Sequence, residues 1–274
     1  MKMEYFAIKT PLITESQTSI TEILLESVKN QGIQLMDFDI FIIASKIISV
    51  LEGLKIPLNS IIDIRKEAFI LAERAHMKPE VVEIVFREAD LVIGAVPGAV
   101  LALKDGILQA NAGVDQSNAG GEGFLILLPK NPIQTATQIR KELIALTGKK
   151  FGVIIADSKT HPLRRGTSGF ALGVSGFTPV IDDRGTFDLY KRPMYITTRA
   201  IADNLVCGAQ ILMGESHQSI PLVIARGCEK KIFTDELSET EFNSSMKMIP
   251  EDCIYMGPFW PLIDQLLDKY RKAD

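Results

Sequence analysis

Asn-Pro-Ile-Gln-Thr-Ala-Thr-Gln-Ile-Arg-Lys-Glu-Leu-Ile-Ala-Leu-Thr-Gly-Lys-Lys-Phe-Gly-Val-Ile-Ile-Ala-Asp-Ser, residues 131–158, is the stretch that decides the fold. From Thr135 to Leu146 the apolar residues recur at the spacing of a helix, and Gly148 follows as a C-terminal cap. Residues 151–156 form an unbroken apolar run, which predicts a buried strand. The stretch therefore joins an amphipathic helix directly to a strand of the core.

Helices and strands are also predicted on both sides of this stretch. Helical spacing covers Thr18 to Val28 behind the candidate caps Ser16, Thr18 and Ser19, and also 66–77, 79–87, 196–213, 238–248 and 261–272. Strands are expected at 39–44, 91–96, 107–110, 124–128 and 220–225, and five glycines in 166–185 indicate tight turns and strands. No steady βαβ rhythm appears and no GxGxxG follows a strand, so the pattern favours an α+β fold with mixed sheets and packed helices over a Rossmann fold.

The composition is that of an ordinary globular protein. The 274 residues carry a formal charge of -4 and 46% hydrophobic residues, which argues against general binding to nucleic acid or to an anionic membrane. Three well-separated cysteines predict a reducing compartment and no zinc site. The N-terminal residues lack the apolar core of a signal peptide, and the longest apolar stretch, 38–51, is too short to span a bilayer. We expect a cytoplasmic protein.

Two apolar runs end in carboxylates that suit a hard cation. Asp115 lies in the segment Asn-Ala-Gly-Val-Asp-Gln-Ser-Asn (111–118), and Asp157-Ser158 follows the strand at 151–156. Together with Asn118, these side chains offer the oxygen ligands that Mg²⁺ and Mn²⁺ prefer. The alternative is that Asp115 and Asn118 only form a turn, as Asp, Asn and Gly often do.

Other polar stretches have both a functional and a structural interpretation. Lys159, His161, Arg164 and Arg165 could grip a polyanion or form a solvated loop. The loop 214–221 could contact a base or a second ion, or simply end a helix; its His217 has no paired nucleophile. Lys46 could meet a phosphate or lie on the surface, and residues 182–188 could form an ion site or a turn with ion pairs. No P-loop is present.

Five segments taken together resemble the coenzyme F420-0:L-glutamate ligase family. They are Asn-Ala-Gly-Val-Asp-Gln-Ser-Asn (111–118), Gly-Val-Ile-Ile-Ala-Asp-Ser (152–158), Arg-Arg-Gly-Thr-Ser-Gly-Phe-Ala-Leu-Gly-Val-Ser-Gly (164–176), Asp-Leu-Tyr (188–190) and Met-Gly-Glu (213–215). Their order and spacing follow the family from the N-terminus to about Gly227. The resemblance implies a ligase domain over residues 1–227, and residues 228–274 are expected to form a helical extension packed on it.

The resemblance also implies site residues and partners. Asp115, Asp157, Ser158 and Glu215 match the family's metal positions, with Asp115 and Asp157 catalytic and two Mg²⁺ or Mn²⁺ ions per site, K⁺ being a further candidate. The nucleotide-contacting positions match Thr10, Pro11, Leu12, Ile13, Ser45, Lys46, Asn118, Met213, Gly214, Glu215, Ser216, His217, Gln218, Ser219 and Ile220. Family members form intertwined homodimers with two α+β subdomains.

The implied reaction is a GTP-dependent amide ligation. The terminal phosphoryl group of GTP passes to the acceptor carboxylate of F420-0, and the amine of L-glutamate displaces phosphate from the acyl phosphate. This chemistry needs no covalent protein nucleophile.

Two departures from the family leave other activities open. Where the family usually has Ser-Lys-Ala-Glu-Gly-Arg, this chain has Ser-Val-Leu-Glu-Gly-Leu (49–54), so Val50 and Leu54 replace two basic residues. The family's Gly-Arg-Pro becomes Lys-Thr-His-Pro (159–162). The alternatives are glutamylation of a different deazaflavin- or pterin-like acid, such as a folate precursor, and a non-catalytic GTP-binding homologue.

Overall fold

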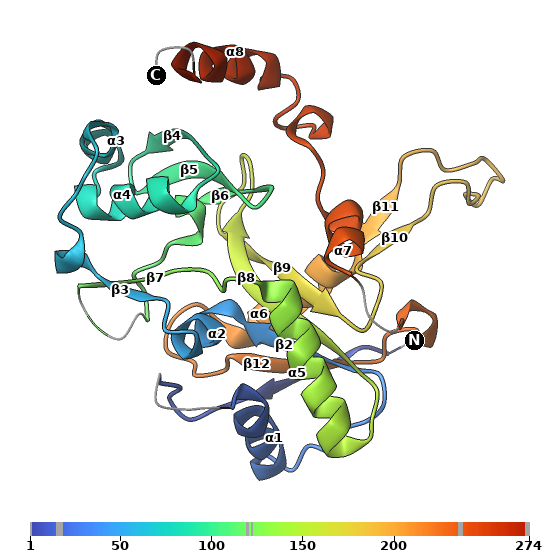
Figure 1. Cartoon of the computed structure of the whole chain (residues 1–274). Coiled ribbons are helices and arrows are strands. Elements are labelled where there is room, and N and C mark those ends of the chain that lie inside the picture. Colours follow the sequence, from blue (N-terminus) through green and yellow to red (C-terminus); the bar gives the residue numbers. More distant parts are fainter. Residues whose placement is uncertain (1, 15–18, 119–120, 122, 235–237, 272–274) are drawn as a thin grey trace.

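A computed structural model describes the chain except residues 1, 15–18, 119–120, 122, 235–237 and 272–274. Its largest sheet has the order β1-β12-β2-β8-β9 (Figure 1). The bounds of these strands are Glu4–Ile8, Leu222–Arg226, Asp39–Ala44, Phe151–Thr160 and Thr167–Ser175. Only β2 and β8 are parallel, and the other pairs in this sheet are antiparallel. The fold is therefore mixed α+β, as the sequence predicts.

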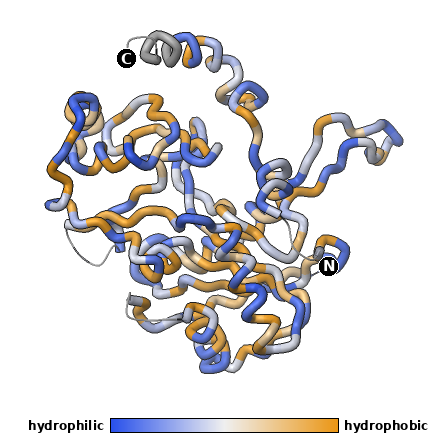
Figure 2. The backbone as a smooth tube through the Cα atoms, in the orientation of Figure 1, coloured by the Kyte–Doolittle hydropathy of each residue, from blue (hydrophilic) through white to orange (hydrophobic). Residues whose placement is uncertain are grey.

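Helices cover both faces of this sheet, which explains why its central strands are apolar on both sides. On one face lie α1 (Ile20–Asn30) and α5 (Pro132–Thr147), which pack against Phe41 and Val153. On the other face α6 (Ile201–Met213) packs against Ile154. Figure 2 shows the hydrophobic colouring that runs through these central strands. Strands that are buried on both faces have continuous apolar sequences, which explains why the apolar runs at 39–44 and 151–156 predict strands correctly.

A second hydrophobic cluster forms around a three-stranded sheet. Strands β4 (Leu91–Val96), β5 (Ala99–Lys104) and β6 (Ile107–Ala110) pair in that order. Helices α3 (Lys66–Ala75) and α4 (Pro79–Glu88) contribute to the same cluster. A short ribbon of β3 (Lys55–Pro57) and β7 (Phe124–Ile126) lies between the two sheets in Figure 1.

The C-terminal region continues from the main sheet. Helix α7 (Glu239–Met246) begins with a capping box at Ser238 and places Phe242 in the main core. Helix α8 (Trp260–Arg271) lies apart from the main sheet in Figure 1. The hairpin of β10 (Val180–Asp182) and β11 (Thr198–Ala200) projects from the body. Among the described residues, no helix is long and apolar enough to cross a membrane.

Several sequence predictions of elements were incomplete or wrong. Strands β1, β3 and β5 were not predicted. The helix predicted from residue 196 begins only at Ile201, and residues 198–200 belong to β11 instead. Helix α2 (Ser45–Leu51), which has Lys46 in its first turn, was not predicted because its β-branched residues are less typical of a helix. Strand β8 continues four residues beyond Ala156, so Asp157, Ser158 and Lys159 lie in a strand and not in a loop.

Glu83 is the buried charge that ties α3 to α4. The residue is 3% exposed, and its carboxylate accepts hydrogen bonds from the backbone and guanidinium of Arg65 and from Arg87 Nε at 2.7–3.2 Å. Burial opposes ionisation of Glu83, but the hydrogen bonds from the two arginines outweigh it and lower its pKa to about 2. Because the pKa is lower in the folded state, this stability is complete above about pH 4.5 and is lost as the pH falls towards 2.

We expect Glu83→Gln to destabilise the protein by about 2–3 kcal/mol at pH 7, a value reduced from that of a fully buried pair because both arginines are partly exposed. The difference from wild type should shrink as the pH falls from 4.5 towards 2. Urea unfolding at several pH values measures this. Glu73→Gln, on the exposed side of α3, is the matched control. An equal loss of stability in both variants would contradict the stabilising role of Glu83.

Candidate active site

Four chain segments meet at one end of the main sheet because of its strand directions. In the parallel pair β2 and β8, Ala44 is opposite Ala156, so Ser45 and Asp157 follow side by side. The antiparallel neighbours β12 and β1 bring the loop that ends at Pro221 and the segment after Ile8 to the same edge. Backbone hydrogen bonds join these segments, from Thr10 N to Ser219 O at 3.2 Å and from Ala44 N to Pro221 O at 2.9 Å.

Asp115 reaches this edge from the other sheet through a strained turn. Asn111, Ala112 and Gly113 all have positive φ, at 54°, 50° and 75°. The left-handed conformation costs a non-glycine residue roughly 1–2 kcal/mol, and here the Asn111 Oδ1 helps to hold it by accepting a 2.9 Å hydrogen bond from Val100 N. The backbones of Asp115 and Ile126 exchange two hydrogen bonds, from Asp115 N to Ile126 O at 3.1 Å and from Ile126 N to Asp115 O at 2.9 Å. The segment 111–118 is thus a fixed turn that presents a carboxylate.

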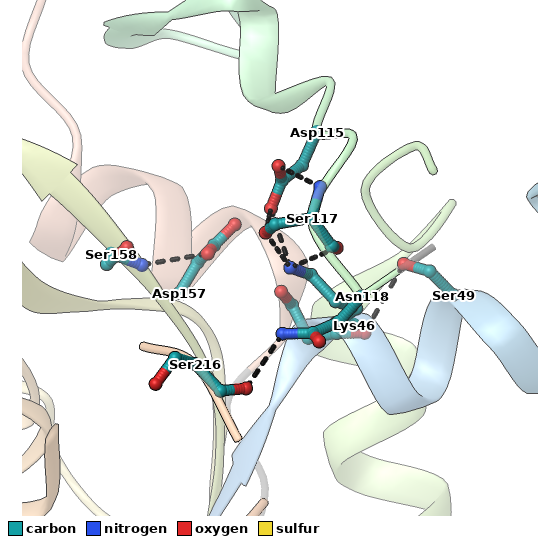
Figure 3. A network of polar contacts seen from close by, with 9 residues as sticks. Lys46, Ser49, Asp115, Ser117, Asn118, Asp157, Ser158 and Ser216 are labelled. Atoms are coloured by element: carbon teal, nitrogen blue, oxygen red, sulfur yellow. Dashed lines mark hydrogen bonds and ion pairs between the residues drawn. The ribbon is translucent and has the colours of Figure 1, made fainter. Parts of the chain in front are cut away.

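Lys46 connects the two sheets at this point. Its Nζ donates to Asp115 Oδ2 at 2.6 Å, to Ser117 O at 2.9 Å and to Ser117 Oγ at 3.0 Å (Figure 3). The three hydrogen bonds use the full donor capacity of an ammonium group. Ser117 also donates to both carboxylate oxygens of Asp115, each at 2.8 Å. Lys46 is therefore a member of the site and not a free surface lysine.

The two carboxylates differ in their protonation behaviour. Burial raises the pKa of Asp157 to about 6, although the N–H of Ser158 and the charge of Lys46 favour its ionised form, and the nearby charge of Asp115 raises the pKa further. Burial also opposes ionisation of Asp115, but hydrogen bonds from Lys46 and Ser117 outweigh it and lower the pKa. The site thus holds two negative groups that influence each other, with one ammonium group bonded to Asp115.

The loop after α6 closes the far side of the site. Glu215 accepts a 3.3 Å hydrogen bond from Thr167 Oγ1 and a further one from Gln210 Nε2. Asn118 Nδ2 donates to Ser216 O at 3.0 Å, which ties the Asp115 segment to this loop (Figure 3). His217 Nδ1 lies 3.1 Å from Ser216 Oγ, a contact within the loop.

These segments surround a cavity of about 450 Å³. Every site residue predicted from the sequence lines it except Asp115, which lines an adjoining cavity of about 190 Å³. Val50, which the sequence marks as a departure from the family, also lines the larger cavity, and sequence reasoning missed Ile47, Val206 and Gln210, which line it too. Val206 and Gln210 lie four residues apart on α6, a spacing that indicates a shared helix face but not what that face contacts. The structure brings the predicted residues together, and their roles stay predictions.

The carboxylates and hydroxyl at this site suit a magnesium-type ion. Among the residues that the structure describes, no group of three or more His, Cys, Asp or Glu side chains could hold a metal ion. Mg²⁺ does not need such a group, since it is usually bound by one or two carboxylates together with water and substrate phosphates. Asp115, Asp157 and the Ser158 hydroxyl fit that pattern by the chemistry of their oxygens, and Lys46 is the ammonium group that is bonded to Asp115 in this structure.

The remaining predicted polar stretches lie outside this cluster or beside it. Lys159 Nζ lies 4.9 Å from the ring centre of Phe170, and His161 is hydrogen-bonded to Ser168, so the basic stretch borders the strand pair β8 and β9. Asp182, Asp183 and Asp188 form ion pairs with Arg184, Arg199 and Arg192. The segment 182–188 therefore supports the interpretation of a turn with ion pairs.

Comparison with known proteins identifies the family. The profile described as F420-0:Gamma-glutamyl ligase matches residues 7–227. Relatives described as coenzyme F420:L-glutamate ligase include those of Methanocaldococcus jannaschii, 39% identical over 82% of this chain and 88% of its own length, and Methanopyrus kandleri, 37% identical over 78% and 82%. That of Methanosarcina mazei is 37% identical over 84% and 87%. The chain belongs to the F420-0:gamma-glutamyl ligase family.

Proposed function

We propose that this protein is a GTP-dependent ligase that joins L-glutamate to the carboxylate of coenzyme F420-0, releasing GDP and phosphate. The observation that carries the proposal is the convergence of Lys46, Asp115 and Asp157 beside one large cavity in a chain of this family. The cavity volume of about 450 Å³ falls within the range of roughly 300–1,000 Å³ that is usual for ligand sites.

The cavity wall offers separate surfaces for the parts of a nucleotide. Apolar side chains, among them Leu12, Ile13 and Ile220, supply a surface for a base. Lys46 adds a positive charge and Asn118 an amide to the same wall, where they suit the phosphates. In this proposal GTP binds along Thr10–Ile13, Ser45, Lys46, Asn118 and Met213–Ile220.

Asp115, Asp157, Ser158 and Glu215 are the proposed ligands of two Mg²⁺ or Mn²⁺ ions, with K⁺ as a further candidate. When bound, such ions neutralise phosphate charge during phosphoryl transfer. The chain itself contributes three things. Lys46 supplies a fixed positive charge, Asp115 is held ionised by its hydrogen bonds, and the loop 213–220 covers the nucleotide.

The reaction then needs two bond exchanges. The acceptor carboxylate oxygen attacks the terminal phosphorus of GTP, so that a P–O bond to GDP breaks and an acyl phosphate forms. The nitrogen of L-glutamate attacks the acyl carbon, phosphate leaves, and the nitrogen releases a proton to phosphate or to water. The residues of the site hold the reactants in line, which is the main contribution that a protein makes to such transfers.

The assembly also belongs to the proposal. Exposed apolar residues on the projecting hairpin, Phe187, Leu189, Tyr190, Tyr195 and Ile196, support an intertwined homodimer. The hydrophobic clusters on the two faces of the main sheet and the separate cluster around the three-stranded sheet support two subdomains. Burial of Phe242 in the main core supports packing of the 228–274 extension on the ligase domain of residues 1–227. We place the enzyme in the cytoplasm.

Purified protein incubated with GTP, Mn²⁺, L-glutamate and F420-0 should form glutamylated F420 and release phosphate only when all four are present. Replacing GTP by ATP measures nucleotide preference. Phosphate release without glutamylated product, or no reaction with any acceptor, would contradict the proposal.

Val50 in the cavity wall favours a second candidate, glutamylation of another acid. An apolar side chain at this position cannot bind an anionic group of a phosphate or a substrate as the family's basic residue could. Competition between F420-0 and pteroate in one reaction decides between the two, since a site built on polar contacts discriminates strongly. Calorimetry that shows GTP binding without metal dependence and without turnover would instead identify a non-catalytic homologue.

A further inference from the structure

Two side chains from different elements hold the carboxylate of Glu215. Gln210, on α6, donates a hydrogen bond from its Nε2 to Glu215 Oε1, and Thr167, the first residue of β9, donates one from its Oγ1 to the same oxygen at 3.3 Å. The Nε2 of Gln210 also donates to Thr167 Oγ1 at 3.5 Å. Both donors bond Oε1, so neither of them occupies Oε2, and Glu215 lines the larger cavity.

The packing of α6 on β9 sets this arrangement. Gly169 of β9 lies so close to Val206 that a Cβ at Gly169 would be 2.5 Å from Val206 Cγ1 and 2.8 Å from the Val206 backbone. Thr167 is two residues before Gly169, so it shares that face of the strand. Gln210 is four residues after Val206, so it shares that face of the helix. The close approach at Gly169 therefore places the side chain of Gln210 beside that of Thr167.

A glycine at the end of α6 brings Glu215 to this pair. Gly214 has φ 66° and ψ -173°, a backbone conformation that is essentially restricted to glycine. Its N–H donates to Gln210 O at 2.9 Å, so the chain turns directly after the last turn of the helix. A Cβ at Gly214 would be 2.3 Å from the Cδ of Gln218, which packs against this turn. The turn at Gly214 thus carries the Glu215 side chain to the amide of Gln210.

Glu215 needs such support more than the other carboxylates of the site. Asp157 lies within β8, and Asp115 is held by hydrogen bonds from Ser117. Glu215 is exposed and stands on a loop. Ordering the rotamers of a long polar side chain costs up to roughly 1.5–2 kcal/mol, and a side chain that is already held avoids part of this cost when a ligand binds.

We propose that Gln210 is a positioning residue, which holds Glu215 by Oε1 and leaves Oε2 to bind a divalent cation. This inference rests on the proposed function, because Glu215 is one of the metal ligands proposed there. In this role Gln210 acts through Glu215 and not on the substrates directly. Thr167 supports the same oxygen from the side of the smaller cavity, which it lines.

Gln210→Met tests the proposal, since it keeps the length of the side chain and removes the donor. The Mn²⁺ dissociation constant, measured by EPR with the metal alone and with GDP, should rise about tenfold, as is usual when a hydrogen bond to a ligating group is lost. In a Glu215→Gln background the same substitution should change this constant by less than about twofold, because the group through which Gln210 acts has been replaced.

Gln138→Met is the matched control. Gln138 donates to Glu142 at 2.7 Å on α5, so this variant also removes a hydrogen bond from a glutamine amide to a glutamate. Neither residue lines a cavity of the site. The control should bind Mn²⁺ as wild type does.

A merely structural role of Gln210 predicts other results. Gln210→Met would then lower the melting temperature without metal and leave the Mn²⁺ dissociation constant unchanged. Because Gln210 is only partly buried and Glu215 is exposed, we expect the melting temperature without metal to change by no more than about 2 °C.

The affinity measurement does not require ligation, so it separates this inference from the proposed function. If wild type binds Mn²⁺ but glutamylates no acceptor, the ligase proposal fails, and the comparison with Gln210→Met still decides the role of Gln210. Unchanged Mn²⁺ affinity in Gln210→Met or in Glu215→Gln overturns the inference, as does an absence of Mn²⁺ binding by wild type in both conditions. An equal loss of affinity on adding Gln210→Met to wild type and to Glu215→Gln also overturns it, because Gln210 would then act independently of Glu215.

Discussion

Asp157→Asn is expected to lower kcat/KM for ligation by about a thousandfold or more, because the metal ions that Asp157 is proposed to hold supply several kcal/mol of charge stabilisation. The variant should nevertheless fold. Asp157 is a carboxylate whose burial opposes its charge, so replacing it by a neutral amide of the same shape removes an unfavourable contribution to folding in the absence of metal. Loss of activity with retained stability distinguishes a site residue from a core residue.

Thermal unfolding with and without Mn²⁺ separates the two effects. A ligand that binds only the folded state raises its stability, so Mn²⁺ should increase the melting temperature of wild type and not that of Asp157→Asn. Asp63→Asn, an exposed aspartate before α3, serves as the matched control and should behave as wild type in both measurements. Wild-type turnover in Asp157→Asn would contradict the proposal that Asp157 is a metal ligand.

Long periodic elements and fully buried strands could be predicted from the sequence, because their patterns are local. Helix α5 was recognised together with its glycine cap, and Ser19 was among the residues expected to cap α1. Residues 15–18, which include Ser16 and Thr18, lie outside the described part of the chain. Strand β1 was missed because Tyr5 and Phe6 form a short segment with no clear alternation, and its strand character comes from pairing with β12.

The site was predictable as a set of residues but not as a geometry. Asp115 and Asp157 follow apolar runs that could be read directly, yet the contact of Lys46 with Asp115 joins residues 69 positions apart. Only the strand order brings them together. The sequence also gave no sign that β8 continues to Thr160, since its polar end resembles a loop until its pairing with β9 is known.

Gln109 shows a different limit of sequence reasoning. A glutamine at the end of a short strand is normally a surface residue. Here its side chain is buried, and its Nε2 has no hydrogen-bond partner among the described residues. These properties arise from packing between the two sheets, which no local pattern reports.

Lys46 links the proposed nucleotide site to the proposed metal site, and its replacement carries the second large expected effect. Lys46→Met keeps the length of the side chain but leaves Asp115 without its ammonium partner and removes a charge from the cavity wall. Groups of this kind contribute roughly a hundred- to a thousandfold to turnover when they act on charge that develops during the reaction. We expect kcat/KM to fall by about that amount.

Lys46→Arg tests whether charge alone is sufficient. A planar guanidinium cannot reproduce the three hydrogen bonds that the compact ammonium group makes to Asp115 and Ser117, so it should restore only part of the activity. Steady-state kinetics of both variants measure whether the activity of Lys46→Arg lies between those of wild type and Lys46→Met. Lys66→Met, at an exposed lysine, is the matched control. If Lys46→Met and Lys46→Arg lose activity equally, geometry governs the role of Lys46. If neither loses activity, the lysine only fastens the Asp115 segment, and the nucleotide phosphates must be bound elsewhere.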